Sequence, residues 1–197
     1  MRRGLSLGAA ALAVLLGAPA AAQDAARGAA LAEERGCGAC HGARGVSAIP
    51  NIPSLAGQQA EFSTLQLILF REGLRQVPAM TEAARGLSDT QVEDLAAHFA
   101  ALPSVQPADR GARDPALVLR GAEVAAGRNC NACHLPSYAG QQNVPRISHQ
   151  REDFLAHTLT EYRDGQRVGA DTQMNGLMHG VTDADIRALA HYLAQRE

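Results

Sequence analysis

The pentapeptides Cys37-Gly38-Ala39-Cys40-His41 and Cys130-Asn131-Ala132-Cys133-His134 share the form C-x-x-C-H, and together they contain all four cysteines of the chain. This form is the attachment signature of a c-type haem. Two thiols separated by two residues can each add to one vinyl group of a porphyrin, and the histidine that follows can bind the iron. The sequence therefore predicts two haem c groups, attached through the four cysteines, with His41 and His134 as iron ligands.

Zinc sites and thioredoxin-like redox centres also contain C-x-x-C pairs. A zinc site would have to gather its thiolates from two distant motifs, and it would leave the histidine of each motif unexplained. A thioredoxin-like centre requires a βαβ setting, and no stretch of this chain alternates apolar and polar residues over a useful length. Both alternatives are therefore weaker than the haem interpretation.

The chain is duplicated well beyond the two motifs. Arg27-Gly28 precedes the first motif by the same distance as Arg120-Gly121 precedes the second. Further along, matched positions recur in the two halves: Gln58 and Gln150, Phe62 and Phe154, Phe70 and Tyr162, Arg71 and Arg163, Gly73 and Gly165, Arg75 and Arg167, and Met80 and Met174. A repeat this long, with each half self-sufficient, predicts two tandem domains and not a solenoid.

Both halves have helical patterns. A capping box at 88–91 precedes Val92, Leu95 and Phe99, which share one helical face, and Thr182 begins the matching segment of the second half. We therefore expect an all-α fold with a first domain at 23–102, a linker at 103–115 and a second domain at 116–197. At about 80 residues each domain has a marginal core, so a haem would supply the missing apolar body.

The first residues predict export. Arg2 and Arg3 precede an apolar stretch at 5–16 and a small-residue cleavage site at 20–22, which together have the form of a signal peptide over 1–22. An uncleaved membrane anchor is the rival interpretation of this segment. The expected location is the periplasm. The formal net charge of −2 and the scattered arginines argue against a nucleic-acid partner.

At this point the chain resembles the class I c-type cytochromes, and most closely the two-haem cytochrome c4 family. The resemblance covers nearly all of the chain after residue 22 and is carried most specifically by Pro53-Ser54-Leu55-Ala56-Gly57-Gln58, by Phe62, Phe70, Arg71, Gly73, Arg75 and Met80, and by 87–89. It implies two tandem cytochrome c-like domains, each around one covalently bound haem. The second half lacks the Leu-Ala-Gly-Gln run, so it resembles the family less closely.

The resemblance also implies roles for single residues. The motif histidines would be proximal ligands, and the backbone carbonyls of Pro53 and Pro145 would accept hydrogen bonds from them. The distal ligand would be a methionine, Met80 for the first haem and Met174 for the second, with Met178 as the rival and His179 as a third possibility. His149 and His157 could lie near the second haem, although a surface position is the default for both.

A haem held by histidine and methionine has no open position for a substrate. The expected function is therefore electron transfer between respiratory redox proteins, among them a membrane-bound oxidase or a dehydrogenase subunit, with no small-molecule substrate. A second interpretation is the cytochrome subunit of a flavocytochrome-type dehydrogenase. A two-haem peroxidase is a third, but that class needs one haem with a vacant or displaceable ligand.

Overall fold

The computed structural model describes residues 23–167 and 172–196, so the predicted signal segment lies outside the described residues. Within them the chain forms helices α1 (Ala25–Glu34), α2 (Gly38–His41), α3 (Ala60–Arg71), α4 (Pro78–Ala84), α5 (Asp89–Ala101), α6 (Pro115–Gly127), α7 (Asn131–His134), α8 (Glu152–Arg163), α9 (Thr172–Met178) and α10 (Asp183–Ala194). A single isolated bridge, between Gln141 and Val144, is the only β pairing in this part of the chain. The all-α prediction is confirmed.

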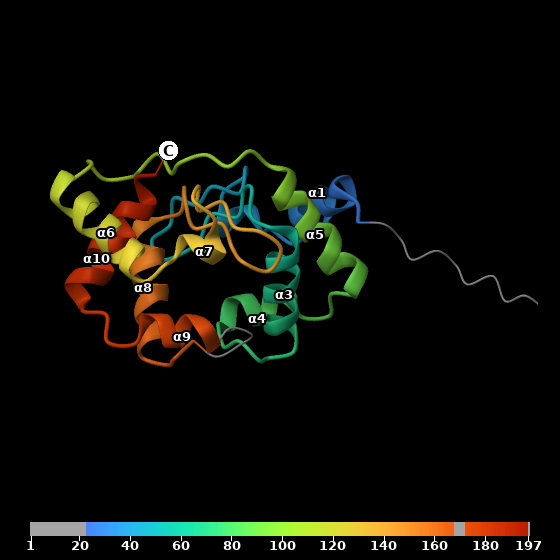
Figure 1. Ribbon diagram of the computed structural model, residues 1–197. Coiled ribbons are helices and arrows are strands. Elements are labelled where there is room, and N and C mark those ends of the chain that lie inside the picture. The colour runs from blue at the N-terminus through green and yellow to red at the C-terminus, as the bar shows by residue number, and fades with distance from the viewer. Residues whose placement is uncertain (1–22, 168–171, 197) are drawn as a thin grey trace, which may run out of the picture.

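The helices form two groups, one from each half of the chain (Figure 1). The buried core of the first group consists of Leu31, Ala32, Phe70, Ala84, Leu87, Val92, Leu95 and Phe99. The core of the second consists of Val124, Ala125, Tyr138, Leu155, Leu159, Met178, Val181, Ile186, Leu189, Ala190, Leu193 and Ala194. Each core draws on one half alone, so the two tandem domains predicted from the repeat are present.

In each domain the first and last helices cross at the glycine of the repeated Arg-Gly pair. A Cβ atom added at Gly28 of α1 would lie 1.9 Å from the backbone oxygen of Asp94 in α5. A Cβ atom added at Gly121 of α6 would lie 2.2 Å from the backbone oxygen of Ala188 in α10. Because only a residue without a side chain permits this approach, the two glycines set the helix crossing in both domains.

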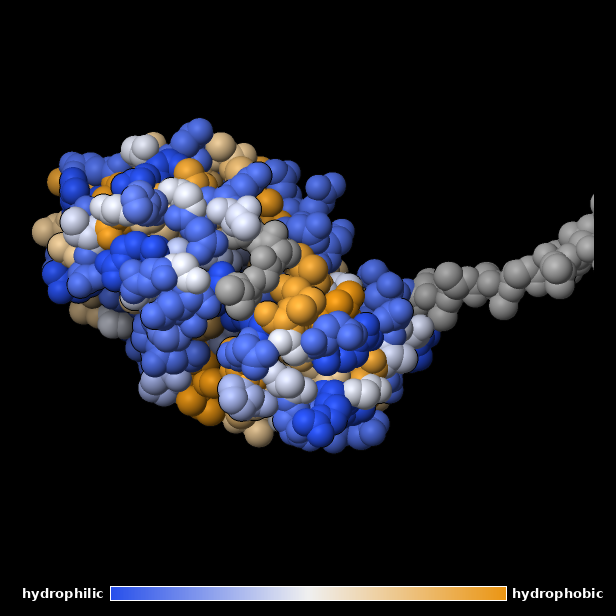
Figure 2. Space-filling model, turned by 90° about the horizontal axis from the view of Figure 1, so that it is seen from below, coloured by the Kyte–Doolittle hydropathy of each residue, from blue (hydrophilic) through white to orange (hydrophobic). Residues whose placement is uncertain are grey.

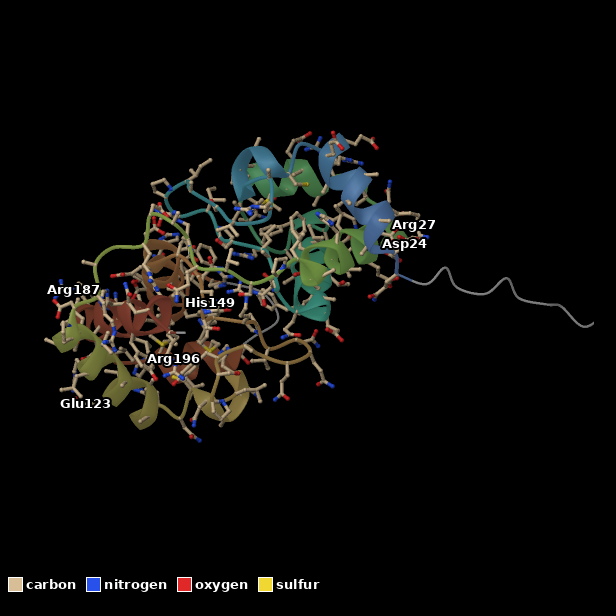
Figure 3. All side chains as sticks on the ribbon, turned by 90° about the horizontal axis from the view of Figure 1, so that it is seen from above. Asp24, Arg27, Glu123, His149, Arg187 and Arg196 are labelled. Atoms are coloured by element: carbon tan, nitrogen blue, oxygen red, sulfur yellow. The ribbon has the colours of Figure 1, made fainter. Side chains whose placement is uncertain are left out.

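The arginine of the same pair stabilises the helix crossing by an ion pair with the last helix of its domain. Arg27 and Asp24 lie together at the start of α1 (Figure 3), and the Nε atom of Arg27 donates to Oδ2 of Asp94 at 2.8 Å. This guanidinium lowers the pKa of the Asp94 carboxyl. In the second domain Nε of Arg120 donates to Oδ1 of Asp185, also at 2.8 Å.

The segment between α5 and α6 runs across the second domain (Figure 1) and is bonded to it at several points. The side chain of Gln106 donates to the carbonyl of Arg196 at 2.7 Å. The backbone N–H of Asp114 donates to Nε2 of His191 at 2.9 Å. The expected linker is therefore extended, but it is attached to the second domain along its length.

Replacing Gly121 by alanine should destabilise the protein by about 3 kcal/mol, because the new methyl group must push α6 away from α10. Gly127→Ala in the same helix is the matched control, since a Cβ atom there meets no atom within 4 Å. Urea unfolding of the holoprotein measures both changes. Equal stabilities of the two variants would contradict the crossing described above.

Candidate haem sites

The two C-x-x-C-H motifs fold in the same way, each as one short helical turn that follows the first helix of its domain. The amide of Cys37 donates to the carbonyl of Ala32 at 2.9 Å, and the amide of Cys130 donates to that of Ala125 at 3.0 Å. The turns α2 and α7 then place the cysteines and the histidine of each motif on one loop. The anchoring of this loop to the first helix explains why the motif follows the Arg-Gly pair at a constant distance.

Each motif histidine is buried and bonded to the predicted proline. His41 is 6% exposed and its Nδ1 atom lies 2.9 Å from the carbonyl oxygen of Pro53. His134 is likewise 6% exposed, with Nδ1 2.9 Å from the carbonyl oxygen of Pro145. Since a carbonyl can only accept, Nδ1 carries the proton, and Nε2 is the ring nitrogen that would bind iron. Burial lowers the pKa of His41, which favours this neutral form.

The four cysteines form no disulfide, and the surroundings of the first cysteine in each motif favour a thiol over a metal-binding thiolate. Burial raises the pKa of Cys37 and of Cys130. Within residues 23–167 and 172–196, no three His, Cys, Asp or Glu side chains lie close enough to hold a metal ion. The geometry therefore gives no support to the zinc alternative.

The methionines differ in where they lie. Met80 of α4 and Met174 of α9 are partly buried and pack at the edge of their domain cores. Met178 is only 2% exposed and lies inside the second core, at the repeat position that Ala84 occupies in the first, where Ala84 is 0% exposed. Met178 is therefore a core residue by position, which leaves Met174 as the match for Met80. His179 is exposed.

His149 and His157, the other two histidines considered from the sequence, each have a structural role or an exposed position. His149 has a φ of 52° and takes the left-handed turn position that Gly57 holds in the first domain, with a φ of 67°. Its Nδ1 atom lies 3.1 Å from the hydroxyl of Ser104 in the linker, and burial lowers its pKa. His157 is an exposed residue of α8, 3.4 Å from Glu161. His149 therefore belongs to the loop that contains Pro145, and His157 belongs to the helix after it.

The loops that follow the motifs also join the two domains, which the sequence did not indicate. The side chain of Gln150 bonds the backbone of Ser54 with both of its polar atoms, at 2.8 Å and 2.9 Å. The side chain of Gln58 bonds the backbone of Arg146 in the same way, at 2.7 Å and 3.1 Å. Gln58 and Gln150 are a matched pair of the repeat, so the sequence marked them as equivalent residues. It did not indicate which residues they bond.

A haem carries two propionate carboxylates, and one buried and one partly buried arginine suit such a group. Burial lowers the pKa of Arg146 to about 10, and its guanidinium donates to the backbone oxygens of Ala56, Gly57 and Ser148. Burial, together with the charge of Arg167, lowers the pKa of Arg75 to about 10, and Arg75 donates to the side-chain oxygen of Gln66. Buried cations bonded to neutral oxygens are suited to a group that brings carboxylates.

Comparisons with known proteins agree with this geometry. The family model described as cytochrome c matches residues 25–103 and 118–197. A cytochrome c4 of Pseudomonas aeruginosa is 37% identical over 91% of this chain and 92% of its own. A thiosulfate dehydrogenase electron acceptor of Stutzerimonas stutzeri is 33% identical over 80% of this chain and 77% of its own. The crystal structure of reduced recombinant cytochrome c4 from Pseudomonas stutzeri is 32% identical, with a TM-score of 0.81, and the match covers 89% of this chain and all of that one.

Replacing Met174 by alanine should abolish the iron-to-sulfur absorption band of the second haem and lower its reduction potential, because a thioether that favours ferrous iron is lost. Met178→Ala should keep the band and reduce stability instead, by about 2 to 5 kcal/mol for a core truncation. Visible spectra of the oxidised holoproteins and urea unfolding separate these effects. Loss of the band in Met178→Ala alone would reverse the assignment.

Proposed function

The chain belongs to the cytochrome c family, as a two-haem protein of the cytochrome c4 type, and we propose that it transfers electrons between respiratory redox proteins in the periplasm. The duplicated site is the main support for this function. In both domains a histidine of the attachment motif is oriented by a proline carbonyl at 2.9 Å, and in both a methionine occupies the matching helix. Two equivalent redox centres in one chain suit a carrier.

The chain's own residues have distinct tasks in this function. Cys37, Cys40, Cys130 and Cys133 would hold the two haems, and His41 with Met80 and His134 with Met174 would bind the two irons. When bound, haem supplies a one-electron couple between ferric and ferrous iron. Because a histidine and a methionine would bind each iron, they would leave no place on it for a substrate, which favours a carrier over a peroxidase.

The surface beside the first methionine suits a transient partner. Figure 2 shows hydrophobic residues gathered in the region of α3 and α4, and Leu74 and Val77, which precede α4, are 58% and 37% exposed. Weak redox complexes bury less than roughly 1,200 Å² of surface, and an apolar patch of limited size is sufficient for them. We assign this patch to partner contact.

A dehydrogenase is the second candidate partner, and a relative gives the specific reason. The electron acceptor of a thiosulfate dehydrogenase shares 33% identity with this chain over most of both lengths. A long-lived complex with a dehydrogenase subunit would require a larger and more apolar interface than a free carrier has. The lifetime of the native complex therefore distinguishes the two candidates.

The periplasmic location rests on the predicted signal segment 1–22 and its cleavage before Gln23. In the part of the chain that the structure describes, no helix has the length and apolar character to cross a membrane. Intact mass spectrometry of the native protein after acid-acetone extraction should give the mass of residues 23–197 plus two haems. A mass equal to the bare polypeptide would contradict covalent attachment, and a retained segment 1–22 would contradict cleavage.

The carrier function predicts two irons that exchange electrons but do not bind external ligands. The reduced holoprotein should bind carbon monoxide poorly, turn over peroxide negligibly and elute alone when the native extract is separated by size. Titration with carbon monoxide in the half-reduced and fully reduced states makes the measurement. Rapid stoichiometric binding at one haem would refute a plain carrier, and stable co-elution with a second polypeptide would favour the dehydrogenase subunit.

A further inference from the structure

In each domain, one peptide unit bonds both the motif histidine and a glutamine of the other domain. The carbonyl of Pro53, which accepts from Nδ1 of His41, and the N–H of Ser54 belong to the same amide group. That N–H donates to the side-chain oxygen of Gln150 in the other domain at 2.8 Å. His41 and Gln150 therefore lie at opposite ends of one continuous chain of hydrogen bonds.

The second domain contains the same chain of bonds in the reverse direction. The carbonyl of Pro145 accepts from Nδ1 of His134, and the N–H of Arg146, in the same amide group, donates to the side-chain oxygen of Gln58 at 2.7 Å. The orientation of both glutamine amides is defined, because each oxygen also accepts the backbone N–H of the following residue. Both connections therefore cross from one domain to the other.

The surroundings strengthen these bonds. Gln58 is 5% exposed, Gln150 is 4%, Ser54 is 1% and Arg146 is 4%. In a buried, low-dielectric setting hydrogen bonds in a chain polarise one another, by an estimated 10 to 30% per bond. An amide whose N–H is already bonded has a more negative carbonyl oxygen. Such an oxygen draws the Nδ1 proton of the histidine more strongly and makes the imidazole a more basic ligand.

We propose that Gln58 and Gln150 are positioning residues that set the basicity of the iron-binding histidine in the opposite domain, Gln58 through Arg146 to His134 and Gln150 through Ser54 to His41. A more basic histidine stabilises ferric iron and lowers the reduction potential. Each domain therefore adjusts the potential of the other domain's haem. The inference rests on the proposed ligation of iron by the two motif histidines.

The coupling is reciprocal, since a free-energy link between two sites acts equally in both directions. Oxidation of either iron strengthens donation by Nδ1 and, through the amide, the bond to the glutamine across the boundary. The contact between the domains is accordingly tighter in the oxidised protein than in the reduced one. A partner that loosens the boundary raises both potentials.

The decisive experiment measures the potential of each haem in Gln58→Met and in Gln150→Met holoprotein. Methionine has a similar length but removes the bonds to the amide. Gln58→Met should raise the potential of the second haem alone, by up to about tenfold in its one-electron equilibrium constant, which corresponds to about 59 mV. Gln150→Met should raise that of the first haem alone. In the reduced proteins the Nδ1 proton resonance of the same opposite-domain histidine should move upfield.

Gln59 provides the matched control. Its side chain also crosses the boundary, to the carbonyls of Ala139 and Gly140 at 2.9 Å and 3.2 Å, but it bonds neither amide of the two chains. Gln59→Met should leave the reduction potentials of both haems unchanged. A shift at the haem of the mutated domain, an equal shift at both haems, or the same shift in the control would each overturn the inference.

A second pair of variants keeps the test decisive if methionine at position 58 prevents folding. Gln58→Glu retains an acceptor for the Arg146 N–H and makes it anionic, so the potential of the second haem should fall. Gln59→Glu puts the same charge one residue away, and an equal fall there would reject the inference. A retained iron-to-sulfur band shows that ligation, and hence the proposed function, is intact in each variant, so unchanged potentials would reject only the role of the glutamines.

Discussion

In each domain a hydrogen bond between Nδ1 of the motif histidine and the carbonyl of the proline in the next loop links the candidate iron ligand to the boundary between the domains. At 2.9 Å in both domains it fixes the tautomer and the orientation of a buried imidazole before any metal is considered. The loop that provides the carbonyl is in turn held by the other domain. One amide group in each half therefore both orients the motif histidine and bonds the other domain.

This arrangement explains why the contact between the domains is polar. A purely hydrophobic contact would hold the domains together, but it would place no donor or acceptor on the amide that follows each proline. The two glutamines bond both the N–H and the carbonyl of Ser54 and of Arg146, so these buried backbone groups have partners. Arg151 adds to the same boundary by donating to the carbonyl of Ser47 and to Asp109 of the linker.

Much of the fold and of the site was predictable because the repeat and the motifs are local in sequence. The C-x-x-C-H turns and the capped last helices depend on residues close together in the chain. The Arg-Gly pairs are recognisable as a repeat, although their partners in the last helices lie far away in the sequence. Spacing favoured Met174 over Met178 as the distal ligand without settling the choice, and the position of Met178 in the core, equivalent to that of Ala84, supports the same preference. The crossed bonds of Gln58 and Gln150 could not be predicted, because a repeat shows which residues are equivalent and not which half provides their partners.

X-ray absorption at the iron edge of the oxidised holoprotein tests the ligation of both irons, since it counts iron ligands without reference to any partner protein. Two irons held by His41 with Met80 and by His134 with Met174 predict two irons per chain, each with an average of one sulfur and five nitrogen neighbours. An average clearly below one sulfur per iron, or a five-coordinate component, would contradict the account of two closed electron-transfer sites.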